Sequence, residues 1–219
     1  MIKHVAFDFD GTLADSVEFC LAVFDRVFRK YMGNDAPDRE DVYENFGMNE
    51  PGVIRFFMGS ANPEAEEDFY ANHRELHPWM CEKPFPGIPG LLDFLRQKNI
   101  PMTILTGRSE TTCNFSLEFL ELQEYFSQAK YGDPEKNDKT GQLKELMKEH
   151  NLAPGELVYI GDAVSDVTAC REAGVTCLTA AWASSARLEA LEKVNPGLIF
   201  LSVADMQEYI AKHLPKQNI

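Results

Sequence analysis

From residue 88 onward, short apolar runs alternate with segments of helical periodicity, and this alternation constrains the fold more than any other feature. The apolar runs are at 101–105, 127–131, 157–160, 175–180 and 198–201. Between them, apolar residues recur three and four positions apart, the spacing of one face of an α-helix. The expected helices are near 88–98, 109–121, 140–150, 165–173, 184–193 and 203–213. Alternating strands and helices predict an α/β fold with a parallel sheet covered on both faces, in which the run 157–160 is central and buried.

The N-terminal part begins in the same way but then diverges from this alternation. Val5-Ala6-Phe7 predicts a buried strand that ends at Asp8, where polar residues and Gly11 break it. A helix is expected from about residue 16. Residues 33–85 predict short helices and no convincing strand, with helices near 38–46, 50–58 and 63–80. A helical insert therefore follows the first strand.

Open sheets of this kind bind ligands beyond the carboxyl ends of their strands. In this chain that rule selects Asp8–Thr12, Thr106-Gly107-Arg108, the loop after residue 131, and Gly161–Asp166. Asp8 and Asp10 are two residues apart, and such close carboxylates repel each other unless a cation lies between them or one is protonated. Asp162 ends another strand at the same edge, with Asp166 behind it. Mg²⁺ prefers carboxylate and carbonyl oxygens, so we predict a magnesium site here.

Phosphoryl transfer requires an in-line nucleophile and positive charge on the phosphoryl oxygens. Asp8 is a candidate nucleophile that would give an aspartyl-phosphate. Asp10 is a candidate acid that protonates the leaving oxygen and then, as a base, activates water. Thr106 offers a hydroxyl donor, and a lysine before the helix near 140–150 offers the remaining cation.

Three motifs in order resemble the haloacid dehalogenase superfamily of phosphatases. Asp8-Phe9-Asp10-Gly11-Thr12 matches D-x-D-G-T, Thr106 matches the second motif, and Gly161–Asp166 matches G-D-x-x-x-D. The extension Leu13–Ser16 and the pair Pro86-Gly87 are similar to the subgroup of phosphoglycolate phosphatases and β-phosphoglucomutases. The third motif departs from the subgroup, whose lysine precedes a proline. Here Lys139 is our choice, and Lys136 is the alternative.

The resemblance implies a Rossmann-like core of residues 1–14 and 86–219 with a small helical cap domain of residues 15–85. It implies Mg²⁺ held by Asp8, the backbone carbonyl of Asp10 and Asp162, with Asp166 in a supporting position. Thr106, Gly107 and Lys139 would bind the phosphoryl group. Arg108 is either solvated or at the mouth of the site.

The predicted function is hydrolysis of a small phosphorylated metabolite, with phosphoglycolate as the default that the resemblance suggests. One alternative is a phosphomutase of the β-phosphoglucomutase type, against which Thr12 argues because those enzymes usually carry valine there. Another is a catalytically silent binding protein on the same scaffold, since a fold alone does not fix a function. The insert carries no motif that identifies the substrate.

Charge and composition exclude other classes. The formal net charge is −14, from 35 acidic and 21 basic residues, which argues against nucleic-acid binding. No apolar stretch is long enough to span a membrane, and the N-terminal residues do not resemble a secretory signal. Five cysteines without C-x-x-C pairs indicate reduced thiols and a cytoplasmic protein. The oligomeric state stays open, and residues 216–219 are expected to fray.

Overall fold

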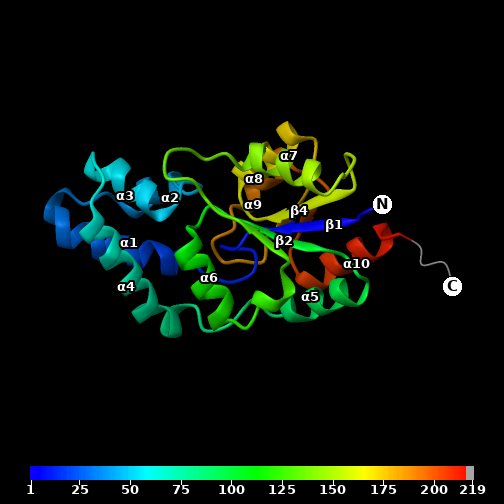
Figure 1. The fold of residues 1–219 in the computed structure, drawn as a ribbon, viewed down its shortest axis with the longest axis horizontal. Coiled ribbons are helices and arrows are strands. Elements are labelled where there is room, and N and C mark those ends of the chain that lie inside the picture. Colours follow the sequence, from blue (N-terminus) through cyan, green and yellow to red (C-terminus); the bar gives the residue numbers. More distant parts are fainter. Residues whose placement is uncertain (216–219) are drawn as a thin grey trace.

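A six-stranded parallel sheet, in the order β3-β2-β1-β4-β5-β6, forms the centre of the molecule (Figure 1). The computed structural model describes residues 1–215, so the predicted fraying of 216–219 lies outside the described residues. The strands are β1 (His4–Phe7), β2 (Met102–Leu105), β3 (Gln128–Lys130), β4 (Leu157–Gly161), β5 (Thr176–Ala180) and β6 (Ile199–Phe200). β1 and β4 occupy the middle and are fully buried. The predicted α/β class and the central position of the run 157–160 are confirmed.

Helices cover both faces of the sheet because successive side chains of each strand point to opposite faces. On one face, Val5 and Phe7 of β1 pack in a core shared with α5 (Ile88–Gln97) and α10 (Val203–His213). On the other face, Ala6 packs in a core shared with α7 (Lys139–Glu149) and α8 (Val164–Ala173). The remaining helices of this part are α6 (Glu110–Phe119) and α9 (Leu188–Val194).

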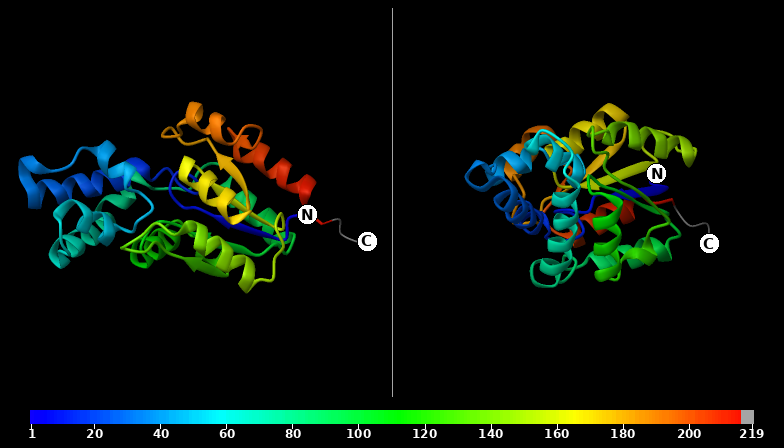
Figure 2. Two further views of the ribbon diagram at one scale, coloured as in Figure 1. Left: turned by 90° about the horizontal axis from the view of Figure 1, so that it is seen from above. Right: turned by 60° about the vertical axis from the view of Figure 1, so that its left-hand side comes forward.

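Four helices that follow β1 lie together beyond one end of the sheet (Figures 1 and 2). They are α1 (Val17–Met32), α2 (Arg39–Glu44), α3 (Glu50–Met58) and α4 (Pro63–Met80). Two phenylalanines of α1 pack against its neighbours, because the ring of Phe24 lies 4.5 Å from that of Phe69 in α4 and the ring of Phe28 lies 5.4 Å from that of Phe57 in α3, between centroids. The predicted helical insert is therefore present, and within the described residues it contains no strand.

The chain enters and leaves this insert through two adjacent segments. The backbone N–H of Phe85 donates to the carbonyl of Leu13 at 2.9 Å, and Ala14 pairs with Pro84 in an antiparallel bridge. The insert is thus attached to the sheet at one place.

Helix boundaries follow the capping residues. Asn49 and Asn62 cap α3 and α4 by accepting the N–H groups of Gly52 and Ala65, and both helices have the predicted bounds. Asp138 caps α7, so this helix begins at Lys139, one residue earlier than predicted.

The start of α9 was predicted wrongly at residue 184. A turn closed by the N–H of Ala186 and the carbonyl of Ala183 precedes it, and the helix begins only at Leu188. The short 3₁₀ helices Gly33–Asp35 and Gln123–Tyr125 were not predicted.

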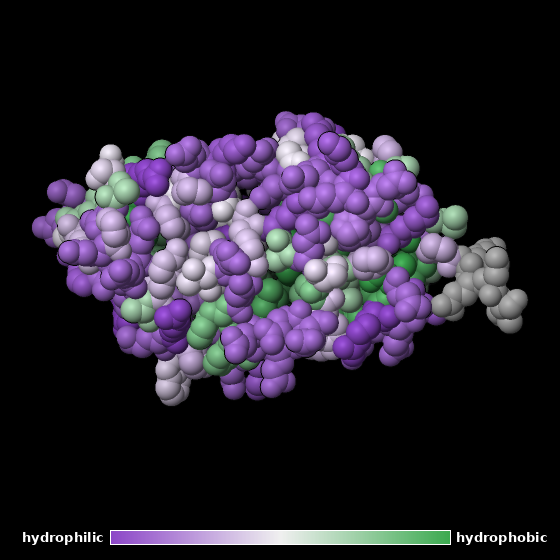
Figure 3. All heavy atoms as spheres, viewed as in Figure 1, coloured by the Kyte–Doolittle hydropathy of each residue, from purple (hydrophilic) through white to green (hydrophobic). Residues whose placement is uncertain are grey.

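The surface is mostly polar. On the face shown in Figure 3, hydrophilic residues dominate and hydrophobic residues show mainly in a band over the sheet-bearing part. Within the described residues, none of the helices combines the length and hydrophobicity that crossing a membrane requires.

Candidate active site

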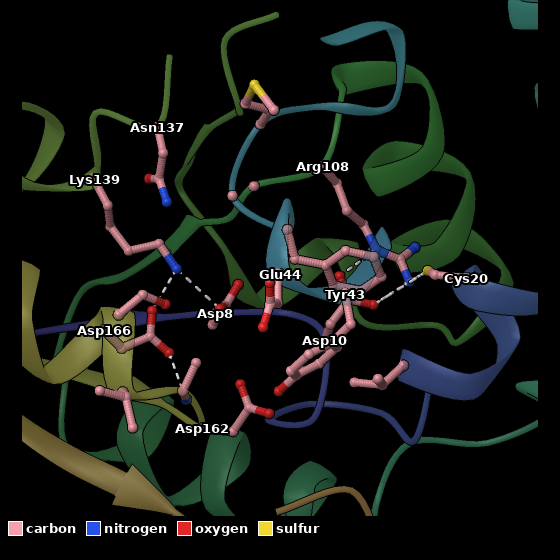
Figure 4. A pocket seen from close by; sticks show the side chains of 18 of the residues that line it. Asp8, Asp10, Cys20, Tyr43, Glu44, Arg108, Asn137, Lys139, Asp162 and Asp166 are labelled. Carbon is pink, nitrogen blue, oxygen red and sulfur yellow. Dashed lines mark hydrogen bonds and ion pairs between the residues drawn. The ribbon is translucent and has the colours of Figure 1, made fainter. Parts of the chain in front are cut away.

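A cavity of about 590 Å³ lies where the strands β1 and β4 end, between the sheet and the helical insert. Its walls come from both sides: the segments that follow β1, β2 and β4, and residues of α1, α2 and α3. Figure 4 shows Lys139 pointing toward Asp8 and Asp166, and Arg108 pointing toward Asp10, at this edge of the sheet. The cavity therefore lies at the edge of the sheet that the strand-end rule selects.

Asp8 lies at the end of β1 with both carboxylate oxygens engaged. Its Oδ1 accepts a hydrogen bond from the backbone N–H of Phe9 at 2.7 Å, and its Oδ2 accepts one from the Lys139 ammonium at 3.0 Å. Burial raises the pKa of Asp8 to about 6, although the charge of Lys139 opposes this shift. The two contacts fix the orientation of the carboxylate.

Lys139, in the first turn of α7, supplies the cation on this side of the cavity. Its Nζ lies 3.0 Å from Asp8 and 2.5 Å from Asp166, and the side chain is about one-tenth exposed. Burial lowers the pKa of Lys139, but the two carboxylates outweigh this and keep it above its ordinary value. Lys136 is exposed, pairs with Asp138 at 2.9 Å and does not line the cavity. Of the two lysines left open by the sequence, the structure brings Lys139 to the site.

Three carboxylates form a compact group that suits a metal ion. One oxygen each of Asp8, Asp162 and Asp166 lies within 4.8 Å of the others. Burial, followed by the charges of Asp166 and Asp8, raises the pKa of Asp162 well above its ordinary value. A divalent cation would relieve this repulsion, and an all-oxygen donor set is what Mg²⁺ prefers. The residues present therefore fit the predicted magnesium ion.

Asp166 is held more firmly than its neighbours. It is completely buried, and its Oδ2 accepts the N–H of Ala163 at 3.0 Å at the start of α8. Its Oδ1 accepts the Lys139 ammonium. Asp166 thus links the lysine to the helix that follows Asp162.

Asp10 makes a two-point ion pair with Arg108. The guanidinium donates from Nε to Oδ2 at 2.9 Å and from Nη2 to Oδ1 at 2.6 Å, and Ser16 Oγ donates to the same Oδ1 at 2.6 Å. Burial raises the pKa of Asp10, but the Arg108 guanidinium outweighs this and holds it below the ordinary value. The carboxylate is therefore ionised and fixed in direction (Figure 4).

Of the two sequence-based interpretations of Arg108, the structure excludes the solvated one and agrees with a place at the cavity. It is only 4 % exposed, so it is not solvated. Its guanidinium is surrounded on other sides, since Nη1 donates to Ser116 Oγ at 2.8 Å and the group lies 4.2 Å above the Phe9 ring. Arg108 lines the cavity, but its charge is directed at Asp10. The sequence signals a strand-end arginine and does not indicate its partner.

Gly107 and Thr106 occupy different positions at the end of β2. Gly107 lines the cavity, and a Cβ there would lie 2.9 Å from the Cα of Gly47 in the insert, so the backbones meet closely. Thr106 is 1 % exposed, and its hydroxyl accepts the N–H of Arg108 at 3.3 Å. Thr106 is not among the residues that line the cavity.

Three insert residues at the site were missed from the sequence. Glu50 is 7 % exposed, and its carboxylate accepts the N–H of Ser109 at 2.8 Å and the hydroxyl of Thr112. Asn49 donates from its side chain to the carbonyl of Gly132 at 3.0 Å. Glu44 also lines the cavity. None belongs to a motif, and their only sequence signal is the helix boundary at which they lie.

The chain belongs to a known class of hydrolases. A family model described as haloacid dehalogenase-like hydrolase matches residues 5–180. Membership of this family, and with it the predicted assignment to the hydrolase enzymes, is confirmed.

Within this family, the chain is similar to several phosphoglycolate phosphatases. The chain is 29% identical over 187 residues to a phosphoglycolate phosphatase of Chromobacterium violaceum, covering 81% of this chain and 84% of that protein. It is 26% identical over 222 residues to a phosphoglycolate phosphatase of Vibrio parahaemolyticus, covering 96% of each. A solved hydrolase structure from Pseudomonas syringae superposes with a TM-score of 0.76 at 19% identity, covering 97% of this chain and 99% of that one. The last similarity supports the fold alone.

Proposed function

We propose that this protein is a magnesium-dependent phosphatase that hydrolyses a small phosphorylated metabolite through an aspartyl-phosphate on Asp8. The observation that carries the proposal is the placement of Asp8 beside Lys139, Asp162 and Asp166 in a cavity of about 590 Å³. The similarity to phosphoglycolate phosphatases supports a phosphate monoester as substrate.

In the first step, an oxygen of Asp8 attacks phosphorus while the bond from phosphorus to the ester oxygen breaks. Lys139 fixes the attacking carboxylate, and the same ammonium reduces the repulsion between it and an incoming phosphate dianion. Gly107, which lines the cavity, is one proposed partner of the phosphoryl oxygens. Thr106, the preceding residue, is the other, although it is buried and does not itself line the cavity. The hydroxyl of Thr106 accepts from Arg108 and still has its own proton to donate.

The proposed metal ligands are Asp8, the backbone carbonyl of Asp10 and Asp162, with Asp166 alongside. When bound, Mg²⁺ supplies positive charge to the phosphoryl oxygens and offsets the neighbouring carboxylates. The carboxylate of Asp10 is already occupied by Arg108 and Ser16, which agrees with a ligand role for its backbone alone.

Asp10 is the proposed acid and base. The Arg108 pair holds its carboxylate ionised, the form that accepts a proton from the water that attacks the aspartyl-phosphate. In the earlier step the leaving oxygen needs a proton. We therefore expect the carboxyl of Asp10 to separate from Arg108 and take up a proton in the substrate complex.

Residues 15–85 are the proposed cap domain over a core of residues 1–14 and 86–219. Contacts between the insert and the core, such as those of Asn49 with Gly132 and of Glu50 with Ser109, hold the two together around the cavity. A closed cap would limit the access of water until the leaving group departs. The five cysteines are all free and buried, which supports the proposed cytoplasmic location.

Replacement of the nucleophile tests the proposal. Asp8→Asn should abolish Mg²⁺-dependent release of phosphate from p-nitrophenyl phosphate, with the fold retained by circular dichroism. Asp15→Asn is the matched control, because Asp15 is exposed in the same loop and does not line the cavity. Activity of Asp8→Asn similar to that of the wild type would contradict the proposal. Release of an isomer in place of phosphate from a sugar phosphate would indicate a phosphomutase.

A further inference from the structure

The cavity that would receive the substrate contains more negative than positive side chains. Six carboxylates and three cationic groups line it. The carboxylates are those of Asp8, Asp10, Glu44, Glu50, Asp162 and Asp166. One divalent cation would leave this lining with a net negative charge, before the phosphate itself is added.

Each of the three cations is already engaged. Lys139 pairs with Asp8 and an adjacent carboxylate, and buried Arg108 pairs with Asp10. Arg187 lies at the rim, where it bonds to Glu40 at 2.6 Å and covers the Tyr43 ring at 4.4 Å.

The insert side of the cavity is apolar apart from acidic groups. The apolar lining residues there are Val17, Phe24, Phe46, Met48 and Val53. The rings of Tyr43 and Phe46 lie 5.4 Å apart between centroids. An apolar wall favours a substrate whose alcohol part is apolar. Aromatic rings beside a carboxylate also favour an alcohol part that carries a positive charge.

Glu44 is exposed and adds a negative charge that has no hydrogen-bonded or ion-paired partner among the described residues, although it helps to raise the pKa of Arg187. It is the last residue of α2 and lines the cavity (Figure 4). Within the described part of the chain, its carboxylate takes part in none of the side-chain hydrogen bonds or ion pairs. Glu50, by contrast, has both oxygens bonded to Ser109 and Thr112. Glu44 is therefore the acidic group best able to act on the leaving group.

We propose that Glu44 selects phosphate monoesters whose alcohol part carries no negative charge, and that anionic esters such as phosphoglycolate are poor substrates. This inference rests on the proposed phosphatase function and specifies the substrate class of the same site. A carboxylate on the leaving group would meet Glu44, and Arg187, the cation whose charge acts on Glu44, is already bonded to Glu40 and half exposed to solvent. Juxtaposed like charges are a common basis of discrimination.

Three esters with the same two-carbon body separate charge from size: 2-phosphoglycolate (anionic), ethyl phosphate (neutral) and O-phosphoethanolamine (cationic). With wild-type enzyme and saturating Mg²⁺, we expect kcat/KM for phosphoglycolate to be on the order of 100-fold below that for ethyl phosphate. Where turnover is too slow, the inhibition constant of each ester against p-nitrophenyl phosphate gives the same comparison. Phosphoglycolate equal to or better than ethyl phosphate overturns the inference.

Variants of Glu44 test its role directly. Glu44→Gln should raise the ratio of phosphoglycolate to ethyl phosphate by about tenfold and Glu44→Lys by more, with the opposite trend for phosphoethanolamine. Glu67→Lys makes the same charge change at an exposed site of α4 outside the cavity and should leave the ratio unchanged. A ratio that does not move in either Glu44 variant overturns the inference.

The outcomes also separate this inference from the proposed function. If the wild-type enzyme releases no phosphate from p-nitrophenyl phosphate or from any ester, the phosphatase function fails and the inference with it. If it releases phosphate but prefers phosphoglycolate, only the inference about Glu44 fails.

Discussion

At the scale of single residues, Gly11 ties the turn after β1 to the carboxylate of Asp162. Its φ is +66°, and a Cβ there would lie 2.1 Å from Asp162 Oδ2. Gly11→Ala should therefore displace Asp162, lower the affinity for Mg²⁺ about tenfold or more, and lower activity at limiting metal. The measurement is kcat/KM as a function of free Mg²⁺.

Gly33 offers a matched control for this substitution. Its φ is +60°, but a Cβ there meets no atom within 4 Å. Both alanine variants carry the strain of a positive φ, which residues with a Cβ adopt only at a cost in free energy. Only Gly11→Ala should change the dependence on Mg²⁺. Equal Mg²⁺ dependence in the two variants would show that the contact with Asp162 is not limiting.

The residues of the site were predictable from sequence to different degrees. Asp8, Asp10 and Asp162 were recognisable because each directly follows or ends an apolar strand, and parallel strands bring such residues to one edge. Lys139 was one of two alternatives, because periodicity does not fix which residue faces inward in the first turn of a helix. The pairing of Arg108 with Asp10 spans 98 positions and has no local signal.

At the scale of elements, Asn49 joins the cap of α3 to the core. Its side chain accepts Gly52 N–H and also donates to the Gly132 carbonyl, whereas the side chain of Asn62 caps α4 and, among the described residues, bonds only within the insert. Asn62→Ala should lower the free energy of unfolding by about 1 kcal/mol, the usual cost of losing a cap. Asn49→Ala should cost about 2 kcal/mol, because a second hydrogen bond is lost.

The same two variants separate an effect on the stability of the fold from an effect on the position of the insert over the cavity. We expect kcat/KM to fall several-fold in Asn49→Ala and to stay near the wild-type value in Asn62→Ala. Urea denaturation and steady-state kinetics on both proteins measure the two effects. Equal losses of activity would mean that the bond to Gly132 does not help to hold the insert in place.

Helix α4 also carries a pH dependence. Burial, with a contribution from the Arg108 charge, lowers the pKa of His73 to about 2 and that of His77 to about 4. Below a pH of about 6.5, these two imidazoles bind protons in the unfolded chain but stay neutral in the folded chain. The free energy of unfolding therefore falls as the pH falls from 7 towards 4. Each histidine contributes up to about 1.4 kcal/mol per pH unit in this window.

Urea midpoints at pH 7 and pH 5 measure this effect. His77→Gln should reduce the difference between the two midpoints, because one of the two buried imidazoles no longer titrates. His213→Gln, at an exposed position of α10, should leave the difference as in the wild type. The expectation is wrong if His77→Gln and the wild type lose equal stability on acidification.

Most elements were predictable because each has a period and a recognisable end. The bounds of α3, α4 and α10 agree with prediction, since capping residues or prolines mark where they begin. α9 was placed too early, because the chain at 183–186 forms a turn that the periodicity does not reveal. The order of the strands depends on pairing between distant segments, which has no local signal. Only the central position of β4 was predictable, from its apolar sequence.

At the scale of the whole molecule, the net charge of −14 opposes the approach of a phosphate dianion. Raising the ionic strength from about 0.01 M to about 0.15 M shortens the screening length from ~30 Å to ~8 Å. We therefore expect kcat/KM for ethyl phosphate to rise with salt, the reverse of electrostatic steering. Mg²⁺ is kept saturating at each salt concentration, and kcat should change little.

Phosphoethanolamine is the control for this experiment. Its ammonium group halves the net charge of the substrate, so the rise in kcat/KM with salt should be smaller than for ethyl phosphate. A fall with salt for both esters would mean that local positive charge at the cavity dominates the surface field.

The single attachment of the insert has a consequence for how this enzyme can change. Because Leu13 and Phe85 are hydrogen-bonded neighbours, the segment between them is an insertion whose two ends meet at one point beside the sheet. Another insert with similarly spaced ends could be grafted there without altering the strand ladder, provided that it keeps a donor to Asp10 in the place of Ser16. If the insert selects the substrate as proposed, selection can change the substrate by exchanging the insert while the strand-end carboxylates stay the same.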